Sequence, residues 1–350
     1  MDHIRRGRGA RFTALLAMSF IALTAAACGS SVPSGSGPPG SGPSGGSGSS
    51  GGSSASPGSV SVAYAASLAY LNEKIVGPAF QKADGLKYAG RAGPSDGLSK
   101  EISSGEITPD VFESVGGDPI KALEPKFTSW YVAFATTSIV VAYNPQSRYA
   151  PQFQAIKDGK KPITDLFPLL ETRGLRLGRT DPNLDPQGRA FIFMLQLAQM
   201  KYHLPAGTVP KIIGTSGLAS ADNSEIFDEA ALEPRLQAGQ LDAASAYESQ
   251  AIQLHLDYIK LPAAINLSDP ALKDDYAKAT MTITGNVPKH GSPLVINITT
   301  IGKSAAGARF AAYVLSQAGL DLHKQGGYTL VTPELTGSGE PAAVQRELGG

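Results

Sequence analysis

Short apolar runs alternate with helical patterns along the chain from residue 60 onward. Each run of strand character precedes a segment in which apolar residues recur every three or four positions: 60–64 before 68–76, 86–89 before 98–104, 175–178 before 190–203, and 241–247 before 249–255. This alternation is typical of an α/β domain with parallel strands. In open α/β sheets, ligands bind at the carboxyl ends of the strands, where helices begin. We therefore expect the functional residues at these strand-to-helix junctions.

The junction with the clearest signal is Gly-Arg-Thr-Asp-Pro-Asn-Leu-Asp-Pro-Gln-Gly at 178–188, which leads into an apolar helix predicted over 189–203. Asp185 is a favoured N-cap residue, and Pro186 suits the first helical position. The start of a helix carries unpaired backbone N–H groups at the positive end of its dipole, so it also suits an anion. From this segment alone, Asp185 is either only a helix cap or a cap at the edge of an anion site.

Two earlier junctions carry serine. Ala-Ala-Ser-Leu at 65–68 places Ser67 at a predicted helix start, and Arg-Ala-Gly-Pro-Ser-Asp-Gly at 91–97 places Ser95 or Asp96 at the next one. Serine is an ordinary N-cap residue, so each serine alone has a purely structural explanation. Because the junctions follow consecutive strands, their hydroxyl and backbone N–H groups together are able to surround one small oxyanion.

The first 28 residues have the pattern of an export signal. Arginines between positions 5 and 11 precede an apolar stretch, 12–27, that is too short to span a membrane comfortably. The stretch ends in Ala-Ala-Ala-Cys, which resembles the lipidation motif of bacterial lipoproteins, with Ala25 where leucine or valine is usual. We expect cleavage and lipidation at Cys28; an ordinary secretory peptide and a retained anchor are the alternatives. Cys28 is the only cysteine, which excludes a disulfide within the chain and a cysteine-based zinc site.

Residues 29–59 consist almost entirely of Gly, Ser and Pro, a composition that cannot bury a core. A flexible linker of about 30 residues spans roughly 30 Å. With a lipid on Cys28, this linker would hold the folded part at the outer face of the cell membrane. The folded part is expected over residues 60–335, and the segment 336–350 is expected to be a loose tail.

Charge and motif content narrow the function. Residues 1–28 carry four arginines and one aspartate of the chain's 30 basic and 30 acidic residues, which leaves 26 and 29 and a net charge of −3. No basic block remains, so nucleic acid is not an expected partner. The histidines lack metal-ligand spacing, and no nucleophile elbow or phosphate-binding loop is present. An enzyme is therefore not expected; the remote alternative is an exported hydrolase with Asp185 and Glu229 as acid and base.

The segments at these junctions resemble the molybdate/tungstate-binding proteins of ABC transporters, in particular their archaeal-type branch. The matching segments, in order, are Val-Ala-Tyr-Ala-Ala-Ser-Leu at 62–68, the 178–188 junction with Leu-Gln-Leu-Ala at 195–198, Leu-Gln-Ala-Gly-Gln-Leu-Asp at 236–242, Tyr-Glu-Ser-Gln-Ala-Ile-Gln at 247–253, and Leu-Pro-Ala-Ala-Ile-Asn-Leu at 261–267. Residues 293–301 and a helix over 305–317 complete the pattern. The resemblance covers nearly all of the folded part.

The resemblance implies an α/β fold of the periplasmic-binding-protein type II: two α/β lobes joined by a two-strand hinge, with a ligand cleft between them. Lobe I would comprise residues 60–142 and 284–335 and lobe II residues 143–283, with the chain crossing near 138–143 and 281–293. The resemblance also implies a monomeric, lipid-anchored receptor without a cofactor. Such a receptor captures molybdate or tungstate and delivers it to an ABC transporter permease.

The resemblance implies that two carboxylates bind the metal at the centre of the oxyanion. They add to the oxygen ligands that the metal already carries. The matching residues are Asp185 and, by its register before 236–242, Glu229. Glu229 also suits the first turn of a helix for electrostatic reasons alone, and Glu248 is the competing candidate. Carboxylates repel a dianion unless they reach the electron-poor metal as hard oxygen ligands. Sulfate and phosphate offer no such centre, so the carboxylate pair would select against them.

Hydroxyl groups are implied as further contacts to the oxyanion. The matching serines are Ser67 and Ser95, although the family's second serine aligns with Pro94 unless the register slips by one residue. Thr180 and Tyr247 lie where additional contacts are expected.

The chain departs from the family pattern directly after the Asp-Pro pair. The family often has Cys-Gly-Tyr there, whereas this chain has Gln-Gly-Arg at 187–189. A positive charge on Arg189 near the pocket would favour a plain tetrahedral oxyanion. Sulfate or phosphate is therefore the alternative ligand.

Overall fold

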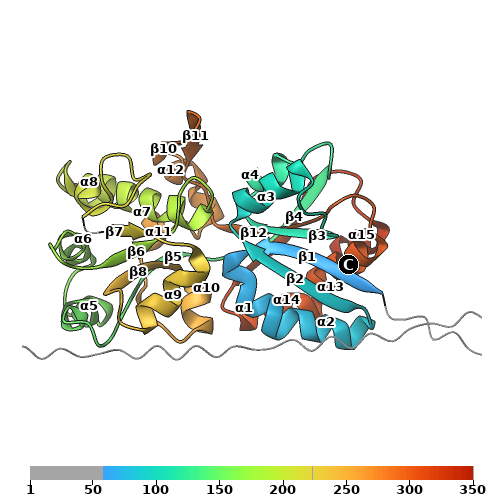
Figure 1. Cartoon of the computed structure of the whole chain (residues 1–350), viewed down its shortest axis with the longest axis horizontal. Helices are drawn as coiled ribbons and strands as arrows, with labels where there is room; N and C mark the ends of the chain where they lie inside the picture. Colours follow the sequence, from blue (N-terminus) through green and yellow to red (C-terminus); the bar gives the residue numbers. More distant parts are fainter. Residues whose placement is uncertain (1–57, 223, 350) are drawn as a thin grey trace, which may run out of the picture. The chain divides into compact units, whose positions relative to one another are not determined.

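The computed structural model describes residues 58–222 and 224–349. The expected signal peptide of residues 1–28, the lipidation site Cys28 and nearly all of the expected linker 29–59 lie outside these ranges. None of the helices formed by the described residues is long and apolar enough to cross a membrane. Two large sheets, one of six strands and one of five, organise this part of the chain (Figure 1).

The six-stranded sheet defines lobe I, which also includes the helices that pack on it. Its strand order is β13-β4-β12-β3-β1-β2. The strands are β1 (Ser59–Ala65), β2 (Lys87–Gly93), β3 (Val111–Val115), β4 (Trp130–Thr136), β12 (Val295–Thr300) and β13 (Thr329–Gly337). β1 is parallel to β2 and β3, whereas β12 and β13 pair antiparallel with their neighbours. Ala65 is in register with Gly93, so the carboxyl ends of β1 and β2 lie side by side.

Helices cover both faces of the six-stranded sheet because its strands are apolar on both sides (Figure 1). In β1, Val62 points to the face that carries α2 and α13, and Ala63 points to the face that carries α3. The helices of lobe I are α1 (Ala69–Leu71), α2 (Gly77–Asp84), α3 (Ser95–Ser104), α4 (Asp118–Lys121), α13 (Ala305–Leu315), α14 (Gln317–Gln325) and α15 (Ala342–Leu348).

The five-stranded sheet defines lobe II. Its order is β7-β6-β8-β5-β9, with strands β5 (Ile139–Tyr143), β6 (Leu177–Arg179), β7 (Ser224–Ile226), β8 (Ala243–Tyr247) and β9 (Asp257–Ile259). β6 is parallel to β7 and β8, so the carboxyl ends of these three strands meet at one edge. Its helices are α5 (Ala150–Lys157), α6 (Leu166–Leu170), α7 (Pro186–Tyr202), α8 (Thr208–Ile213), α9 (Glu229–Gln237), α10 (Glu248–Gln253), α11 (Ala263–Asn266) and α12 (Lys273–Tyr276).

Two short connections join the lobes. The chain leaves β4 at Thr136 and enters β5 at Ile139, and it returns to lobe I where β12 begins at Val295. The backbone N–H of Thr137 donates to the carbonyl of Leu294 at 3.0 Å, so the connections lie side by side. A two-stranded hairpin, β10 (Thr280–Ile283) with β11 (Val287–His290), precedes the return.

The observed strand pairing moves both expected lobe boundaries. The expectation assigned residues up to 142 to lobe I, but β5 pairs with β8 and β9 and therefore belongs to lobe II from Ile139 onward. The second boundary was expected between residues 283 and 284, which lie within one antiparallel hairpin. Backbone hydrogen bonds between β10 and β11 keep that segment together, so the return begins after the hairpin.

The expected loose tail at 336–350 is wrong for the residues that the structure describes. β13 continues to Gly337 and pairs with Trp130 of β4, and α15 follows at Ala342. Val344 of α15 is fully buried against the core of lobe I. Apolar burial holds this segment although its composition is typical of a loop.

Candidate functional site

The polar residues expected at the strand-to-helix junctions gather at the carboxyl ends of parallel strands from both lobes. The residues, each with the strand that it follows or ends, are Ser67 (β1), Ser95 (β2), Thr180 and Asp185 (β6), Glu229 (β7) and Tyr247 (β8). All six are buried, with at most 4% of their surface exposed. This is the edge at which ligands bind in open α/β sheets.

The start of α7 places Asp185 as expected from its sequence. The Asp185 side chain accepts a hydrogen bond from the backbone N–H of Gln187 at 2.8 Å and caps the helix, and Pro186 occupies the first turn. A Cβ atom at Gly188 would lie 2.4 Å from the Thr180 carbonyl oxygen. Only glycine therefore lets the first turn of α7 pack against the Thr180 loop, which brings Thr180 and Asp185 together.

Four of the six residues present a buried polar atom that has no hydrogen-bond partner. The atoms are Ser67 Oγ, Thr180 Oγ1, Asp185 Oδ2 and Tyr247 Oη. Buried polar atoms in native proteins are almost always paired, and each unpaired one needs an explanation. Four such atoms lie at the edge where strands of both lobes meet, which makes this edge the candidate site for a polar ligand.

Glu229 occupies the centre of this group. It is the first residue of α9 and lines two adjoining cavities. One cavity, of about 290 Å³, includes Ser67 of lobe I, and the other, of about 350 Å³, includes Thr180 and Asp185. Glu229 therefore connects the two sides of the candidate site.

One oxygen of Glu229 is held by two amide groups. Its Oε1 accepts hydrogen bonds from Nε2 of Gln187 and from Nε2 of Gln250, both at 2.8 Å. The Gln250 amide also donates to Oε1 of Glu233 at 3.1 Å. Asp185 follows the same pattern, since Oδ1 is bonded and Oδ2 is free. Each carboxylate thus uses one oxygen for anchoring.

Burial raises the pKa of both carboxyl groups, Asp185 and Glu229. Burial raises the pKa of Asp185 above its usual value, and the Gln187 backbone N–H opposes the shift. Burial raises the pKa of Glu229 further, and the nearby charges of Asp185 and Glu233 add to that rise. The amides of Gln187 and Gln250 lower the pKa of Glu229, because they donate to its charged form. The carboxyl groups of Asp185 and Glu229 therefore bind protons more tightly than ordinary carboxyl groups do.

Tyr247 supplies a neutral donor. Burial and the charges of Asp185 and Glu229 raise the pKa of its phenol well above the usual value, so the hydroxyl keeps its proton. Ser67 and Thr180 have hydroxyls of the same kind, without a partner. The arrangement therefore combines buried hydroxyl donors with carboxylate oxygens that no anchoring bond uses.

Two sequence expectations need adjustment. Ser95 does not cap α3, whose N-cap is Pro94; its Oγ instead accepts from the Val115 backbone N–H at 3.3 Å. Glu248, the competing second carboxylate, accepts from Ser138 Oγ at 2.7 Å and pairs with Lys260 at 2.9 Å. Because these partners occupy both oxygens of Glu248, the structure places Glu229 rather than Glu248 beside Asp185.

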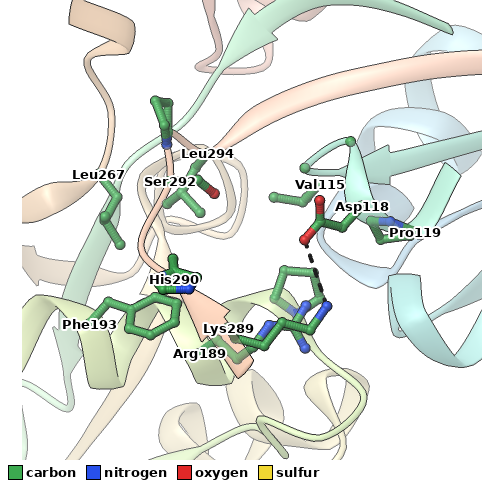
Figure 2. A pocket seen from close by; sticks show the side chains of 15 residues that line it. Val115, Asp118, Pro119, Arg189, Phe193, Leu267, Lys289, His290, Ser292 and Leu294 are labelled. Carbon is green, nitrogen blue, oxygen red and sulfur yellow. Dashed lines mark ion pairs between the residues drawn. The ribbon is translucent and has the colours of Figure 1, made fainter. Parts of the chain in front are cut away.

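Arg189 does not offer a free positive charge to the site. One terminal nitrogen donates to the Asp96 carboxylate of α3, and the other donates to the Pro182 carbonyl at 2.9 Å. Asp96 also lies 3.7 Å from Lys289 Nζ, and Lys289 lies 3.7 Å from Asp118. Figure 2 shows Arg189, Lys289 and Asp118 around a separate pocket. The Arg189–Asp96 pair instead links α7 of lobe II to α3 of lobe I.

The sequence did not lead us to the amide, carboxyl and hydroxyl groups that contact the site residues from the protein interior. Glu233 lies four residues after Glu229 and so on the same helix face, and Ser245 lies two residues before Tyr247 and so on the same strand face. These two spacings could have been used to predict the positions of Glu233 and Ser245. The hydrogen bond between Gln187 and Gln250, 63 residues apart, could not be predicted from spacing.

Comparisons with known proteins identify similar chains. Residues 60–329 match the family described as bacterial extracellular solute-binding protein. The chain is 30% identical over 251 residues to a Haloferax volcanii protein named, provisionally, as a molybdenum-binding protein of an ABC transporter; the match covers 72% of this chain and 76% of that protein. It is 26% identical over 242 residues to the molybdate/tungstate-binding protein WtpA of Pyrococcus abyssi, covering 63% of this chain and 68% of that protein.

A solved structure supports the expected fold. The periplasmic molybdate-binding protein of Azotobacter vinelandii aligns with 78% of this chain and 99% of its own, with a TM-score of 0.53 and 16% identity. The expected fold, with two α/β lobes of the periplasmic-binding-protein type, is confirmed.

Proposed function

The chain belongs to the bacterial extracellular solute-binding proteins, and from this premise we propose that it captures molybdate or tungstate and delivers it to the permease of an ABC transporter. As a member of that family it is a solute-binding protein and not an enzyme, so Asp185 and Glu229 are not an acid/base pair of a hydrolase. The names of its relatives from Haloferax volcanii and Pyrococcus abyssi support molybdenum or tungsten oxyanions as ligands.

The observation that carries this proposal is the set of unpaired polar atoms. Ser67, Thr180 and Tyr247 each hold a buried hydroxyl without a partner, suited to donate to the oxygens of a tetrahedral anion. Asp185 and Glu229 each keep one oxygen outside their anchoring bonds. We assign the hydroxyls to the oxyanion oxygens and the carboxylates to the metal.

The energetics of the carboxylates favour a metal oxyanion over sulfate or phosphate. Two like charges 4 Å apart repel by about 4 kcal/mol at an effective dielectric constant near 20. Molybdenum and tungsten offset this repulsion because they accept additional hard oxygen ligands. Sulfur and phosphorus do not, so the carboxylates would lower the affinity for their oxyanions.

The sign of the pH dependence distinguishes these ligands. Burial raises the pKa values of Asp185 and Glu229, so these carboxyl groups hold their protons to a higher pH than ordinary carboxyl groups do. Binding to a metal requires the charged carboxylates and releases these protons, so affinity rises with pH, by up to about tenfold per unit for each proton released. An oxyanion bound only by hydrogen bonds favours the protonated carboxyls, so its affinity falls as pH rises.

Isothermal titration calorimetry with molybdate, tungstate, sulfate and phosphate tests both statements. Titrations between about pH 5 and 8 in buffers of different ionisation enthalpy give affinity and proton release together. We expect tight binding of molybdate or tungstate with proton release, and weak binding of sulfate and phosphate. Tight sulfate or phosphate binding with proton uptake, and no response to the metal oxyanions, would refute the proposal.

Membrane attachment is a separate part of the proposal. A lipid on Cys28, followed by the Gly/Ser/Pro linker, would hold the receptor beside its permease. Mass spectrometry of the exported protein is expected to find a mature N-terminus at Cys28 that carries acyl chains. An unmodified cysteine, or a chain cleaved elsewhere, would show that the protein is secreted or anchored in another way.

A further inference from the structure

Gln187 hydrogen-bonds to both candidate metal-binding carboxylates. Its backbone N–H donates to Oδ1 of Asp185 at 2.8 Å, and its side-chain Nε2 donates to Oε1 of Glu229 at 2.8 Å. The side chain is completely buried. The first turn of α7 therefore ties the cap of its own helix to the first residue of α9.

The orientation of the Gln187 amide is determined by its other partners. Oε1 of Gln187 accepts from the Ser245 hydroxyl at 2.9 Å, and Nε2 also donates to Oε1 of Gln250 at 3.0 Å. The reversed amide would set its oxygen against acceptor oxygens of Glu229 and Gln250. Ser245 on β8 and Gln250 on α10 thus hold the amide with its N–H groups toward Glu229.

From this geometry we propose that Gln187 is a positioning residue for oxyanion selectivity: it fixes the separation of the Asp185 and Glu229 carboxylates and turns one free oxygen of each toward the metal of the ligand. The inference rests on the proposed function, because it concerns how the same site prefers a metal oxyanion. Gln187 itself does not touch the ligand, since both of its hydrogen-bonding faces are occupied within the protein.

The Gln187 amide also determines which oxygen of Glu229 is left for a ligand. Its N–H group donates to Oε1, so the other oxygen of the carboxylate is outside this bond. Loss of the amide therefore predicts weaker binding of a metal oxyanion, which uses that oxygen, and no loss for sulfate, which does not.

The test is Gln187→Met, which keeps the backbone N–H to Asp185 and the length of the side chain but removes the amide. We expect molybdate or tungstate affinity to fall about tenfold or more near pH 7, because a charge-assisted hydrogen bond is lost. Sulfate affinity should not fall. Gln196→Met, at a half-buried position of the same helix, removes a bond to the Thr280 carbonyl and should leave the affinity for every oxyanion unchanged.

A second variant tests the same inference if Gln187→Met does not fold. Ser245→Ala removes only the hydroxyl that orients the amide, so a smaller loss of molybdate or tungstate affinity, about threefold, is expected, again without a loss for sulfate. In a Glu229→Gln background, Gln187→Met should have little further effect, because the two residues act on one interaction.

The outcomes separate this inference from the proposed function. If the unchanged protein binds neither molybdate nor tungstate, the proposed function fails. If the unchanged protein binds them and both variants bind with the same affinity, Gln187 is not a positioning residue. A loss that is equal for every oxyanion would show a general structural role and would also overturn the inference.

Discussion

Replacing Asp185 with asparagine is expected to lower the affinity for molybdate or tungstate at least about a hundredfold, roughly 3 kcal/mol, while the protein remains folded. Asparagine keeps the oxygen that accepts from the Gln187 backbone N–H, and Asn and Asp are equally good N-cap residues. It replaces the free Oδ2, however, with a neutral amide that does not coordinate a metal. Calorimetric titration combined with thermal unfolding measures the two effects separately.

Asp185→Ala provides the comparison. It removes the cap as well as the ligand, so it should lose the same affinity and also about 1 kcal/mol of unfolding free energy. The contrary result is normal molybdate or tungstate affinity in Asp185→Asn, with a lower melting temperature in Asp185→Ala as the only change. Asp185 would then be a helix cap and not a metal ligand.

Replacing Glu229 with glutamine is expected to reverse the preference of the site. Oε1 keeps its bonds from Gln187 and Gln250, but the anionic ligand is lost, so metal-oxyanion affinity should fall about a hundredfold. Sulfate affinity should rise, because a negative charge leaves the pocket. The pKa of Glu229 is raised in the folded state, so the stability that it contributes is lost as pH rises through that value. The variant should therefore be more stable than the unchanged protein above neutral pH.

Glu248→Gln is the matched control for this prediction. Glu248 also begins a helix after a strand, but its oxygens are used by Ser138 and Lys260. We expect molybdate affinity to change by less than about threefold, since exposed ion pairs contribute little. If Glu248→Gln loses as much molybdate affinity as Glu229→Gln, or more, then Glu248 is the second carboxylate ligand.

Local signals in the sequence were sufficient to predict most helices and strands and the strand-to-helix junctions at which the candidate site residues lie. The N-cap at Asp185 followed from Asp-Pro before an apolar helix, and the structure confirms that cap. The strand-to-helix alternation placed Ser67 at a strand end, and the family resemblance added Thr180 and Tyr247; the structure leaves all three hydroxyls unpaired. These predictions succeed because capping and periodicity depend on residues within one or two turns of each other.

Contacts between distant segments were not predictable in this way. Arg189 seemed available to an anion until the structure placed Asp96, 93 residues away, on its guanidinium. Val344 has little apolar sequence around it, yet α15 packs it into lobe I. The amide orientation at Gln187 depends on Ser245, 58 residues away. Such pairings are set by strand order, which periodicity alone does not determine.

The central claim is that two carboxylates bind the metal of a captured oxyanion, and X-ray absorption at the molybdenum edge tests it most directly. The protein loaded with one equivalent of molybdate should show more oxygen neighbours around molybdenum than the free ion, with a weakened tetrahedral pre-edge feature. Asp185→Asn or Glu229→Gln should restore the tetrahedral spectrum for any molybdate that still binds. An unchanged tetrahedral spectrum in the loaded, unaltered protein would contradict the claim.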